Sequence, residues 1–490
     1  MHQYISVALL FLLSFSFTSC HDAYSDNPNH KLTFSVDTLR FDTVFTSIGS
    51  ATARVLIHNT NEKTLNIQHI SLEERGNSHF RINVDGMAND ENVMRDVEIG
   101  ARDSLFLFVE VTIDPIHKNS PLLVSDKLLF SVNEHVQSIV LEAYGQDVEV
   151  LRQKYILNDT ILPGGKPYLV YDYLAIDTAK TLTLDAGCTI YFHDKAQLVV
   201  YGNLKANGTL EKPVVLRGDR MDDILPDVPY NSVSGQWDGV YLMSDNGLHE
   251  LHYVQMNSGY NGLYLSNTNV EKRPKIILNN ARIHNFAYYG LVAQNADVEV
   301  VNTEISNCGS YCVYLSGGTH RFQHTTIANY YNHPSTMLHP TVREDKPALC
   351  INDIPKLKAP MATLLQNCIV AGSRNNELGL YVAFPENYNG VFENNLIQSD
   401  SLAHMPQFER NTWISNSTHI GYGGETMLLF RNIRYEDEGK WQYYDFRLDS
   451  ASVACGVADV SLSEKYPLDR NGNNRLADGK PDAGAYELTE

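Results

Sequence analysis

The hydrophobic positions of this chain repeat most clearly between residues 275 and 329. Short apolar runs with strand-like alternation are separated there by turns rich in Asn and Gly, and no run is long enough for a helix. Three isoleucines recur at a step of 22 residues. A short fixed period predicts a solenoid, and several short strands per period predict a right-handed parallel β-helix. The isoleucines that mark the period are Ile283, Ile305 and Ile327.

Successive coils of such a solenoid lay equivalent residues on one another. The three isoleucines are therefore expected inside, and the flanking asparagines are expected at corners, where their amides would form a ladder along the axis. We place the parallel β-helix at residues 181–400. A connector at residues 149–180 is expected before it, and irregular C-terminal coils with a cap over the last coil are expected at residues 401–490.

A second pattern covers residues 32–148. Along 105–113, every second residue from Leu105 to Ile113 is a Leu, Val or Ile, so these residues would share one face of a strand. Turn signals separate six or seven such short strands. This arrangement predicts an immunoglobulin-like (Ig-like) β-sandwich. The expected fold class is therefore all-β, with an N-terminal Ig-like β-sandwich followed by a right-handed parallel β-helix solenoid.

The N-terminus has the features of an export signal. Residues 1–19 contain no Lys, Arg, Asp or Glu, and their apolar core at 7–17 is shorter than the roughly 20 residues of a membrane-spanning helix. The following Phe-Thr-Ser-Cys sequence resembles a bacterial lipobox, which implies cleavage before Cys20 and its lipidation. The alternative is an ordinary secretory signal that happens to contain this cysteine. Residues 20–31 would then be the lipidated cysteine and a flexible tether.

Two further resemblances concern the predicted domains. Residues 57–59 and 109–115 resemble segments of the Ig-like domains of the abnormal-spindle and hydin group, which implies a spacer or protein-binding module. Residues 198–209, 212–216 and 235–240 resemble the first coils of right-handed parallel β-helix lipoproteins of the Bacteroidota, where these segments are structural. With the lipobox, this implies a protein anchored to the bacterial outer membrane by lipid, either surface-exposed or facing the periplasm.

Charge and motifs exclude some functions. The formal net charge is −20, and Lys and Arg do not cluster into a basic stripe. Nucleic acid is therefore not an expected partner. There is no Gly-x-Ser-x-Gly sequence and no Gly-rich loop that would cradle a phosphate, so neither a nucleotide nor another cofactor is predicted.

An acidic insertion at residues 217–234 contains the best candidates for chemistry. Loops that leave a solenoid tend to share one face, and that face is usually where binding occurs. The β-helix polysaccharide lyases and hydrolases place paired acidic groups or a Ca2+ site on such a face, so this resemblance implies a catalytic or metal role for carboxylates here. The alternative is a solvated acidic loop, because the sequence does not show the separation of the carboxylates. The candidates are Asp219, Asp222, Asp223 and Asp238.

A calcium loop near the C-terminus is the second metal candidate. Asp469, Asn471 and Asn473 occupy alternate positions as in an EF-hand. The sixth position is Asn474 in place of Gly, and the twelfth is Lys480 in place of Glu. We therefore predict a solenoid cap here, with a calcium loop as the alternative.

Six cysteines follow Cys20. An even number in an exported chain allows disulfides, but scattered cysteines in solenoid strands also serve as small buried apolar residues. Only one pair, Cys308 and Cys312, is close in sequence, and its disulfide state stays open. The six are Cys188, Cys308, Cys312, Cys350, Cys368 and Cys455.

Seven Asp-Ser or Asp-Thr pairs precede an aliphatic residue or alanine. This pattern is similar to the O-glycosylation sequon of exported Bacteroidota proteins. The alternative is structural, because Asp favours turns and Thr favours strands. The candidate hydroxyl residues are Thr38, Thr43, Ser104, Thr160, Thr178, Ser401 and Ser450.

The expected function is that of a cell-envelope lipoprotein whose β-helix is a binding or scaffolding surface for glycans or other envelope proteins. One alternative is a polysaccharide lyase or glycoside hydrolase that uses the loop-bearing face, and another is a purely structural spacer or assembly component. These expectations rest on analogy between folds. Tyr288, Tyr289 and Tyr311 fall in turns of successive coils, where they would pack at an outer corner or, alternatively, form a ladder on which sugars stack.

Overall fold

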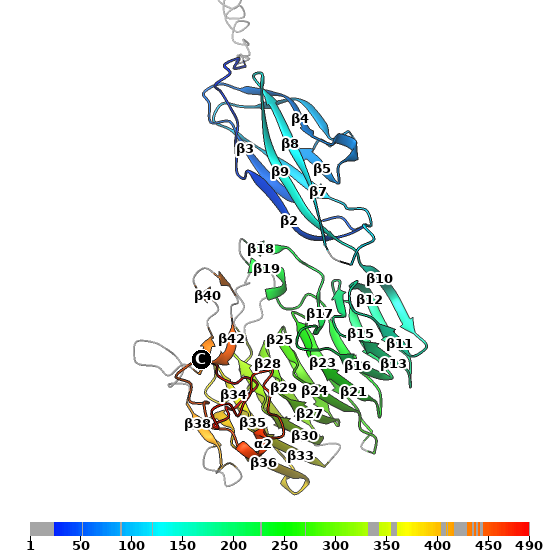
Figure 1. The fold of residues 1–490 in the computed structure, drawn as a ribbon, viewed down its shortest axis with the longest axis vertical. Helices are drawn as coiled ribbons and strands as arrows, with labels where there is room; N and C mark the ends of the chain where they lie inside the picture. Colours follow the sequence, from blue (N-terminus) through cyan, green and yellow to red (C-terminus); the bar gives the residue numbers. More distant parts are fainter. Residues whose placement is uncertain are drawn as a thin grey trace, which may run out of the picture. The chain divides into compact units, whose positions relative to one another are not determined.

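The computed structural model describes most of the chain and divides it into two compact units, which separate after Asp147 (Figure 1). Among the described residues, α-helix is confined to α2 (Val460–Ser463), so the all-β fold class is confirmed. The described residues are 24–50, 52–88, 91–119, 121–225, 228–269, 271–331, 343–353, 360–402, 408, 410–415, 429–433, 436–437, 440–441 and 444–489.

The first unit is a β-sandwich of two sheets. Alternate residues of their strands point into one apolar core, in which Ile57, Val109 and Phe130 are fully buried. One sheet has the order β1 (Thr33–Phe34), β3 (Ala53–His58), β7 (Ser104–Val111), β5 (Phe80–Val84). The other has the order β2 (Thr38–Phe45), β9 (His135–Gln146), β8 (Leu122–Val132), β4 (Leu65–Leu72), β6 (Val93–Ile99). A 3-10 turn, η1 (Arg75–Asn77), follows β4.

The predicted flexible tether is wrong for its described part. Ser25 is buried, and its backbone N–H donates to the carbonyl of Thr64 at 2.9 Å. Asn133 Nδ2 also donates to the Asn27 carbonyl at 3.0 Å. Residues 24–31 therefore pack on the sandwich, because their backbone groups find partners there. The lipidation candidate Cys20 lies outside the described residues.

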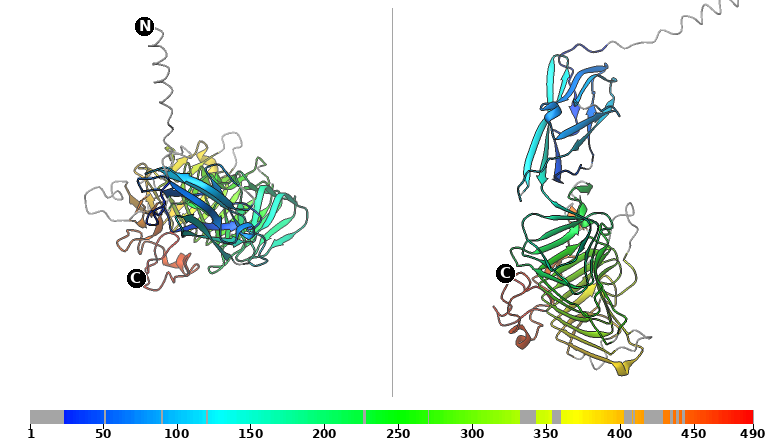
Figure 2. Two further views of the ribbon diagram at one scale, coloured as in Figure 1. Left: turned by 90° about the horizontal axis from the view of Figure 1, so that it is seen from above. Right: turned by 90° about the vertical axis from the view of Figure 1, so that its right-hand side faces the viewer.

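The second unit is a parallel β-helix (Figure 2). A typical coil contributes one strand to a 9-stranded sheet and two to an 18-stranded sheet, which passes around a corner of the coil. The smaller sheet contains β11 (Thr160–Leu162), β13 (Thr181–Leu184), β16 (Asn203–Asn207), β21 (Leu248–His252), β24 (Lys275–Asn279), β27 (Asp297–Val301), β30 (Gly318–Gln323), β33 (Met361–Gln366) and β36 (Tyr388–Glu393).

The larger sheet has the same parallel register from coil to coil. It contains β10 (Glu149–Ile156), β12 (Tyr168–Ile176), β14 (Thr189–Phe192), β15 (Gln197–Val200), β17 (Val214–Gly218), β20 (Gly239–Leu242), β22 (Val254–Asn257), β23 (Asn261–Ser266), β25 (Arg282–Phe286), β26 (Tyr289–Gln294), β28 (Glu304–Cys308), β29 (Val313–Ser316), β31 (Thr326–Asn329), β32 (Leu349–Asn352), β34 (Ile369–Gly372), β35 (Leu378–Tyr381), β37 (Leu396–Gln398) and β38 (Thr412–Ile414). The 3-10 turn η3 (Pro385–Asn387) precedes β36.

The predicted isoleucine stack is confirmed. Ile283 is the register partner of Ile305, which is in turn the register partner of Ile327, and all three are fully buried. Stacked β-branched residues fill the coil interior without leaving voids, which accounts for the strict period of this stretch.

The predicted asparagine ladder takes a different form. Asn280 and Asn302 adopt the left-handed conformation, with φ of 55° and 47°, so that the chain can turn between sheets. Their backbone N–H groups donate to the carbonyls of Val301 and Gln323 in the next coil, at 3.1 and 3.2 Å. This corner is thus joined by backbone bonds. A side-chain ladder begins one residue earlier, where Gln323 Nε2 donates to Gln366 Oε1 at 2.9 Å. At the other end of the motif the side-chain amide does bond along the axis, because Asn329 Nδ2 donates to the Cys308 and Ser310 carbonyls at 2.9 and 3.1 Å.

The residues expected to form a connector belong to the solenoid. Within 149–180, strands β10, β11 and β12 pair in parallel with each other or with later strands. Gly164 and Gly165 lie in a bend between β11 and β12, within the first coil.

Only the first described residues of the C-terminal part lie at the last coil as predicted: Leu402 and Phe408 are buried in the solenoid core, and the Phe408 ring centroid lies 4.5 Å from that of Phe392. Residues 444–489 instead follow the side of the solenoid, where Ile369 and Leu396 point outward and are covered by Phe430 and Phe446. An outward apolar face needs such a cover, and this one extends across several coils (Figure 2). Two short antiparallel pairs accompany it, formed by β39 (Phe430–Asn432) with β42 (Asp445–Leu448) and by β40 (Glu436–Asp437) with β41 (Lys440–Trp441).

Candidate functional site

Asp219, the first predicted carboxylate, forms a dyad with a histidine that the sequence analysis missed. Its Oδ2 lies 2.7 Å from His193 Nδ1. The imidazole packs on Tyr171 with ring centroids 4.6 Å apart, and the guanidinium of Arg152 lies 4.1 Å from the Tyr171 ring centroid. These four residues come from consecutive levels of the first coils, which places them in one column on the outer surface.

The other predicted carboxylates have separate partners. Asp222 binds Arg220 through two hydrogen bonds of 2.7 and 2.5 Å. Asp223 begins β18 (Asp223–Leu225), which pairs with β19 (Val228–Pro229) in a small hairpin that ends at the 3-10 turn η2 (Tyr230–Ser232). Asp238 accepts a hydrogen bond from the Tyr241 hydroxyl at 2.9 Å. Asp219, Asp222 and Asp238 are therefore each bonded to a different side chain, His193, Arg220 and Tyr241.

A row of tyrosines follows one corner of the larger sheet, and we call it the tyrosine strip. The rings of Tyr289 and Tyr311 are nearly parallel, with an interplanar angle of 8° and centroids 6.2 Å apart. Tyr260 and Tyr288 are similar, with an angle of 23° and a separation of 6.0 Å. Tyr288 is 42% exposed, and the other rings are partly exposed. The strip consists of Tyr241, Tyr260, Tyr264, Tyr288, Tyr289, Tyr311 and Tyr314.

The coil register aligns the strip with the acidic candidate Asp238. The N–H of Asn261 donates to the Asp238 carbonyl at 2.8 Å, and Asn261 is the register partner of Tyr289. The next level of this column is Tyr311. One column of surface residues therefore consists of Asp238, Asn261, Tyr289 and Tyr311, one from each of four successive coils.

The strip hydroxyls are held by polar neighbours. Asn261 Nδ2 donates to the Tyr241 hydroxyl at 3.2 Å, while that hydroxyl donates to Asp238. Asn352 Nδ2 donates to the Tyr314 hydroxyl at 3.1 Å. Burial first, and then the bond to Asp238, raise the pKa of Tyr241 to about 12. The Tyr241 phenol thus stays neutral, and the strip presents a row of hydroxyl and amide groups beside apolar ring surface.

A repeated motif in the sequence marks this corner, although only three tyrosines of the strip, Tyr288, Tyr289 and Tyr311, were predicted to lie here. The motif x-Gly-(Val/Leu)-x occurs at 238–241, 261–264 and 289–292, with Tyr in the last position of the first two copies. The glycines are required by close coil stacking. A Cβ on Gly262 would stand 2.1 Å from the Gly290 carbonyl oxygen, which no side chain can do without moving the backbone.

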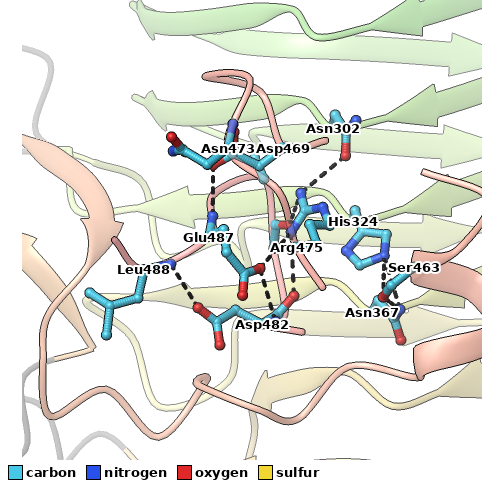
Figure 3. Close-up of polar contacts among 12 residues, drawn as sticks. Asn302, His324, Asn367, Ser463, Asp469, Asn473, Arg475, Asp482, Glu487 and Leu488 are labelled. Atoms are coloured by element: carbon cyan, nitrogen blue, oxygen red, sulfur yellow. Dashed lines mark hydrogen bonds and ion pairs between the residues drawn. The ribbon is translucent and has the colours of Figure 1, made fainter. Parts of the chain in front are cut away.

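The candidate calcium loop is a different kind of structure. The Asp469 carboxylate accepts hydrogen bonds from the backbone N–H groups of Asn471, Asn473 and Glu487, at 2.7 to 2.8 Å (Figure 3). Its oxygens are therefore occupied by donors and hold a turn. Within the described ranges, no group of three or more His, Cys, Asp or Glu side chains is placed to hold a metal ion.

Around that turn, a buried polar cluster attaches the C-terminal segment to the solenoid (Figure 3). Arg475 is fully buried and donates to Asn302 Oδ1 and to the Gly484 carbonyl, both at 3.0 Å. Its Nη1 lies 3.5 Å from Glu487 Oε2. Burial and then the nearby carboxylate of Asp482 raise the pKa of Glu487 to about 8.

The remaining candidate residues are dispersed. All six cysteines within the described residues are free thiols, and five of them are buried.

The seven candidate glycosylation residues are exposed or half-buried, which leaves their hydroxyls within reach of solvent. In the part of the chain that the structure describes, no helix has the length and apolarity needed to cross a bilayer.

Comparisons with known proteins show distant structural similarity only. No family model and no curated protein matches the sequence. A protein of unknown function from Porphyromonas gingivalis W83 is 14% identical over 26% of this chain and 60% of its own length, with a TM-score of 0.18. The ASH / PapD-like domain 7 of human CEP192 is 11% identical over 27% of this chain and 98% of that domain, also with a TM-score of 0.18.

A third solved structure is a family 123 glycoside hydrolase from Clostridium perfringens. It is 9% identical, covers 24% of this chain and 26% of its own length, and has a TM-score of 0.18. Similarity at this level carries no functional argument. The chain is an all-β protein in which a β-sandwich, antiparallel except for the parallel pair β2–β9, precedes a parallel β-helix.

Proposed function

We propose that this chain is a glycan-binding scaffold of the bacterial cell envelope and that the tyrosine strip is its binding surface. The observation that supports the proposal is the presence of partly exposed strip tyrosines on four successive coils, next to Asp238, Asn261 and Asn352. The strip extends over four levels of the larger sheet, from β20 through β23 and β26 to β29. Three strand spacings of about 4.8 Å give a length of about 14 Å.

The chemistry of the strip suits a sugar polymer. Tyrosine rings offer apolar surface with a negative face toward which sugar C–H groups can point, and their hydroxyls bond to sugar hydroxyls. The flanking asparagines and the aspartate add donors and acceptors at fixed positions. Because the rings are held by their neighbours, little side-chain entropy is lost on binding.

The location in the envelope is part of the same proposal. Residues 1–19 supply the export signal, and lipidated Cys20 supplies the membrane anchor, so that the protein is attached to the outer membrane at its surface or periplasmic side. Mass spectrometry of the membrane-extracted protein tests this, because a diacyl or triacyl mass on a chain that begins at Cys20 is expected. A mature chain without lipid would contradict the anchor while leaving the strip untested by that measurement.

A binding experiment tests the strip directly. Purified protein is screened against neutral oligosaccharides, and the best one is titrated by calorimetry against the wild type and the Tyr264→Ala and Tyr288→Ala variants. Each change is expected to weaken binding at least about tenfold, which corresponds to about 1.4 kcal/mol. The matched control is Tyr201→Ala, because Tyr201 is 43% exposed but is not part of the strip. Equal losses in all three variants would contradict the proposal.

The second candidate function is that of a carbohydrate-active lyase or hydrolase, and the His193–Asp219 dyad favours it. A carboxylate that accepts from one imidazole nitrogen orients the ring and lets the other nitrogen act as a general base. If this is correct, cleavage of an acidic or neutral polysaccharide is lost in both Asp219→Asn and His193→Gln variants. Binding without cleavage supports the scaffold, and the absence of both supports a purely structural spacer.

A further inference from the structure

A second candidate binding site lies on the sandwich, far from the tyrosine strip in sequence. A groove of about 560 Å3 opens on the sheet that contains β4, β6 and β8. Register pairs bring Arg95, His69 and Ser131 side by side across the three strands. The next row of the same sheet places Val93, Ser71 and Leu129 together. The groove is lined by His69, Ser71, Arg75, Gly76, Glu91, Val93, Arg95, Leu129, Ser131 and Val136.

The charge of this groove is opposite to that of the chain as a whole. Its described lining residues include two arginines and a histidine but a single carboxylate, Glu91, in a protein of formal net charge −20. The ion pairs found among the described residues of this unit involve Arg40, Arg102 and Lys127. The guanidinium groups of Arg75 and Arg95 have no carboxylate partner among the described residues.

The hydrogen-bonding capacity of the groove also favours an anion. Arg95 Nη1 lies 3.3 Å from His69 Nδ1. Since a guanidinium only donates, Nδ1 accepts and the imidazole proton is on Nε2. The two arginines, this N–H and the hydroxyls of Ser71 and Ser131 together provide donors, and a planar guanidinium matches a carboxylate or phosphate through paired bonds.

The floor of the groove is apolar. Val93 and Leu129 are partly exposed at its base, and Val136 is 65% exposed at one side. Apolar surface next to convergent donors suits a ligand with a charged group on a ring or chain rather than a free ion.

We propose that this groove binds an anionic saccharide, whose charge is a carboxylate or a phosphate. The Arg75 and Arg95 guanidinium groups bind the oxyanion, the two serines bind sugar hydroxyls, and the apolar floor contacts the ring. The proposal is independent of the tyrosine strip, because it concerns the other unit and other residues.

The test is calorimetric titration of the purified full chain with trigalacturonic acid, mannose 6-phosphate, maltotriose and inorganic phosphate. At least one of the two acidic sugars is expected to bind, and the one that binds identifies the oxyanion. Arg75→Gln and Arg95→Gln are each expected to weaken that binding at least about tenfold, whereas Arg81→Gln serves as the matched control. Arg81 is exposed and lies on β5 of the opposite sheet. Binding should also weaken as the salt concentration rises from about 50 to about 500 mM.

Several outcomes would overturn the inference. The first is that maltotriose binds as tightly as the acidic sugars, and the second is that inorganic phosphate does so. The third is that Arg81→Gln weakens binding as much as Arg95→Gln does. The fourth is that none of the four probes binds. Thermal unfolding of each variant checks that the sandwich stays folded, and the exposed positions of these arginines predict little change. The Tyr264→Ala and Tyr288→Ala variants should bind the acidic probe as the wild type does, so failure here and failure of the solenoid proposal can be told apart.

Discussion

The Tyr486 hydroxyl donates a hydrogen bond to Glu304 Oε2, across a sequence separation of 182 residues. Glu304 is 1% exposed, and its other oxygen accepts from Arg282 Nε at 3.1 Å and from Ser306 Oγ at 2.7 Å. This contact attaches the C-terminal segment to the middle of the solenoid. A buried carboxylate with three donors is stable only while all of them are in place.

Removal of the Tyr486 hydroxyl should therefore destabilise the solenoid unit. Tyr486→Phe leaves one oxygen of a buried carboxylate without this donor, and the free energy of unfolding is expected to fall by about 1–3 kcal/mol. Chemical denaturation measures the change. Tyr381→Phe is the control, because Tyr381 is 57% exposed and its substitution should change stability by less than about 0.5 kcal/mol. Equal effects in the two variants would show that the buried bond contributes nothing.

The same carboxylate predicts a dependence on acid. Burial would raise the pKa of Glu304, but Arg282 and the Tyr486 bond outweigh it and lower the pKa to about 2. A lowered pKa means that the stabilisation is present above the unfolded value of about 4.3 and is lost as the pH falls through about 2. Glu304→Gln should be less stable than the wild type at pH 6, and the gap should close between pH 4 and pH 2. A gap independent of pH would contradict this.

Glu487 predicts the opposite dependence. Because burial and Asp482 raise its pKa to about 8, the folded state favours the protonated acid. Its contribution is then present below the unfolded value of about 4.3 and is lost as the pH rises through about 8. The melting temperature of the wild type should fall between pH 5 and pH 9 more than that of Glu487→Gln, which keeps the neutral form at every pH. A larger fall in the variant would refute the assignment.

Sequence and structure agree where the chain repeats and differ where it does not. Ile283, Ile305 and Ile327 were predictable because each coil in that stretch has the same length, so a fixed step gives the register. Elsewhere the coils change length, and the partner of Asp219 is His193, 26 residues away, at a spacing that occurs nowhere in the visible repeat. Register, and therefore side-chain contact, cannot be counted from sequence once loops interrupt the coils.

The C-terminal segment shows the same limit. Its end was expected to cover the last coil because solenoids need caps. The outward apolar residues Ile369 and Leu396 instead created a second surface that had to be covered. Periodicity indicates which residues are apolar, but it does not show that some of them face outward.

The burial of the free cysteines predicts slow alkylation. Burial raises the pKa of Cys188, Cys368 and Cys455 to about 12, so each holds little thiolate at pH 8 and access to the reagent decides which reacts. With iodoacetamide under native conditions, Cys455 should react first because it is half-buried, and the other five should react only after denaturation. Peptide mass spectrometry identifies each site. A Cys308–Cys312 peptide two hydrogens lighter than expected would show that the pair is oxidised in the exported protein.

The ion pair of Arg343 with Glu377 should be the most costly one to break. Their side chains are 2% and 0% exposed, and two hydrogen bonds of 2.8 and 2.5 Å join them. Arg343→Met leaves a buried carboxylate without its cation, so the free energy of unfolding should fall by about 3–5 kcal/mol. Arg410→Met is the matched control, since Arg410 pairs with Glu393 at 2.8 Å while 62% exposed, and it should cost less than about 1 kcal/mol.

A second variant separates loss of charge pairing from loss of packing. Glu377 also accepts from the backbone N–H groups of Ala348 and Arg374, at 2.8 and 2.7 Å, and a glutamine can retain an acceptor for them. The double variant Arg343→Met with Glu377→Gln should therefore be more stable than Arg343→Met alone, because no unpaired charge remains buried. If the double variant is instead less stable by the sum of the two single losses, the pair acts through packing and not through charge.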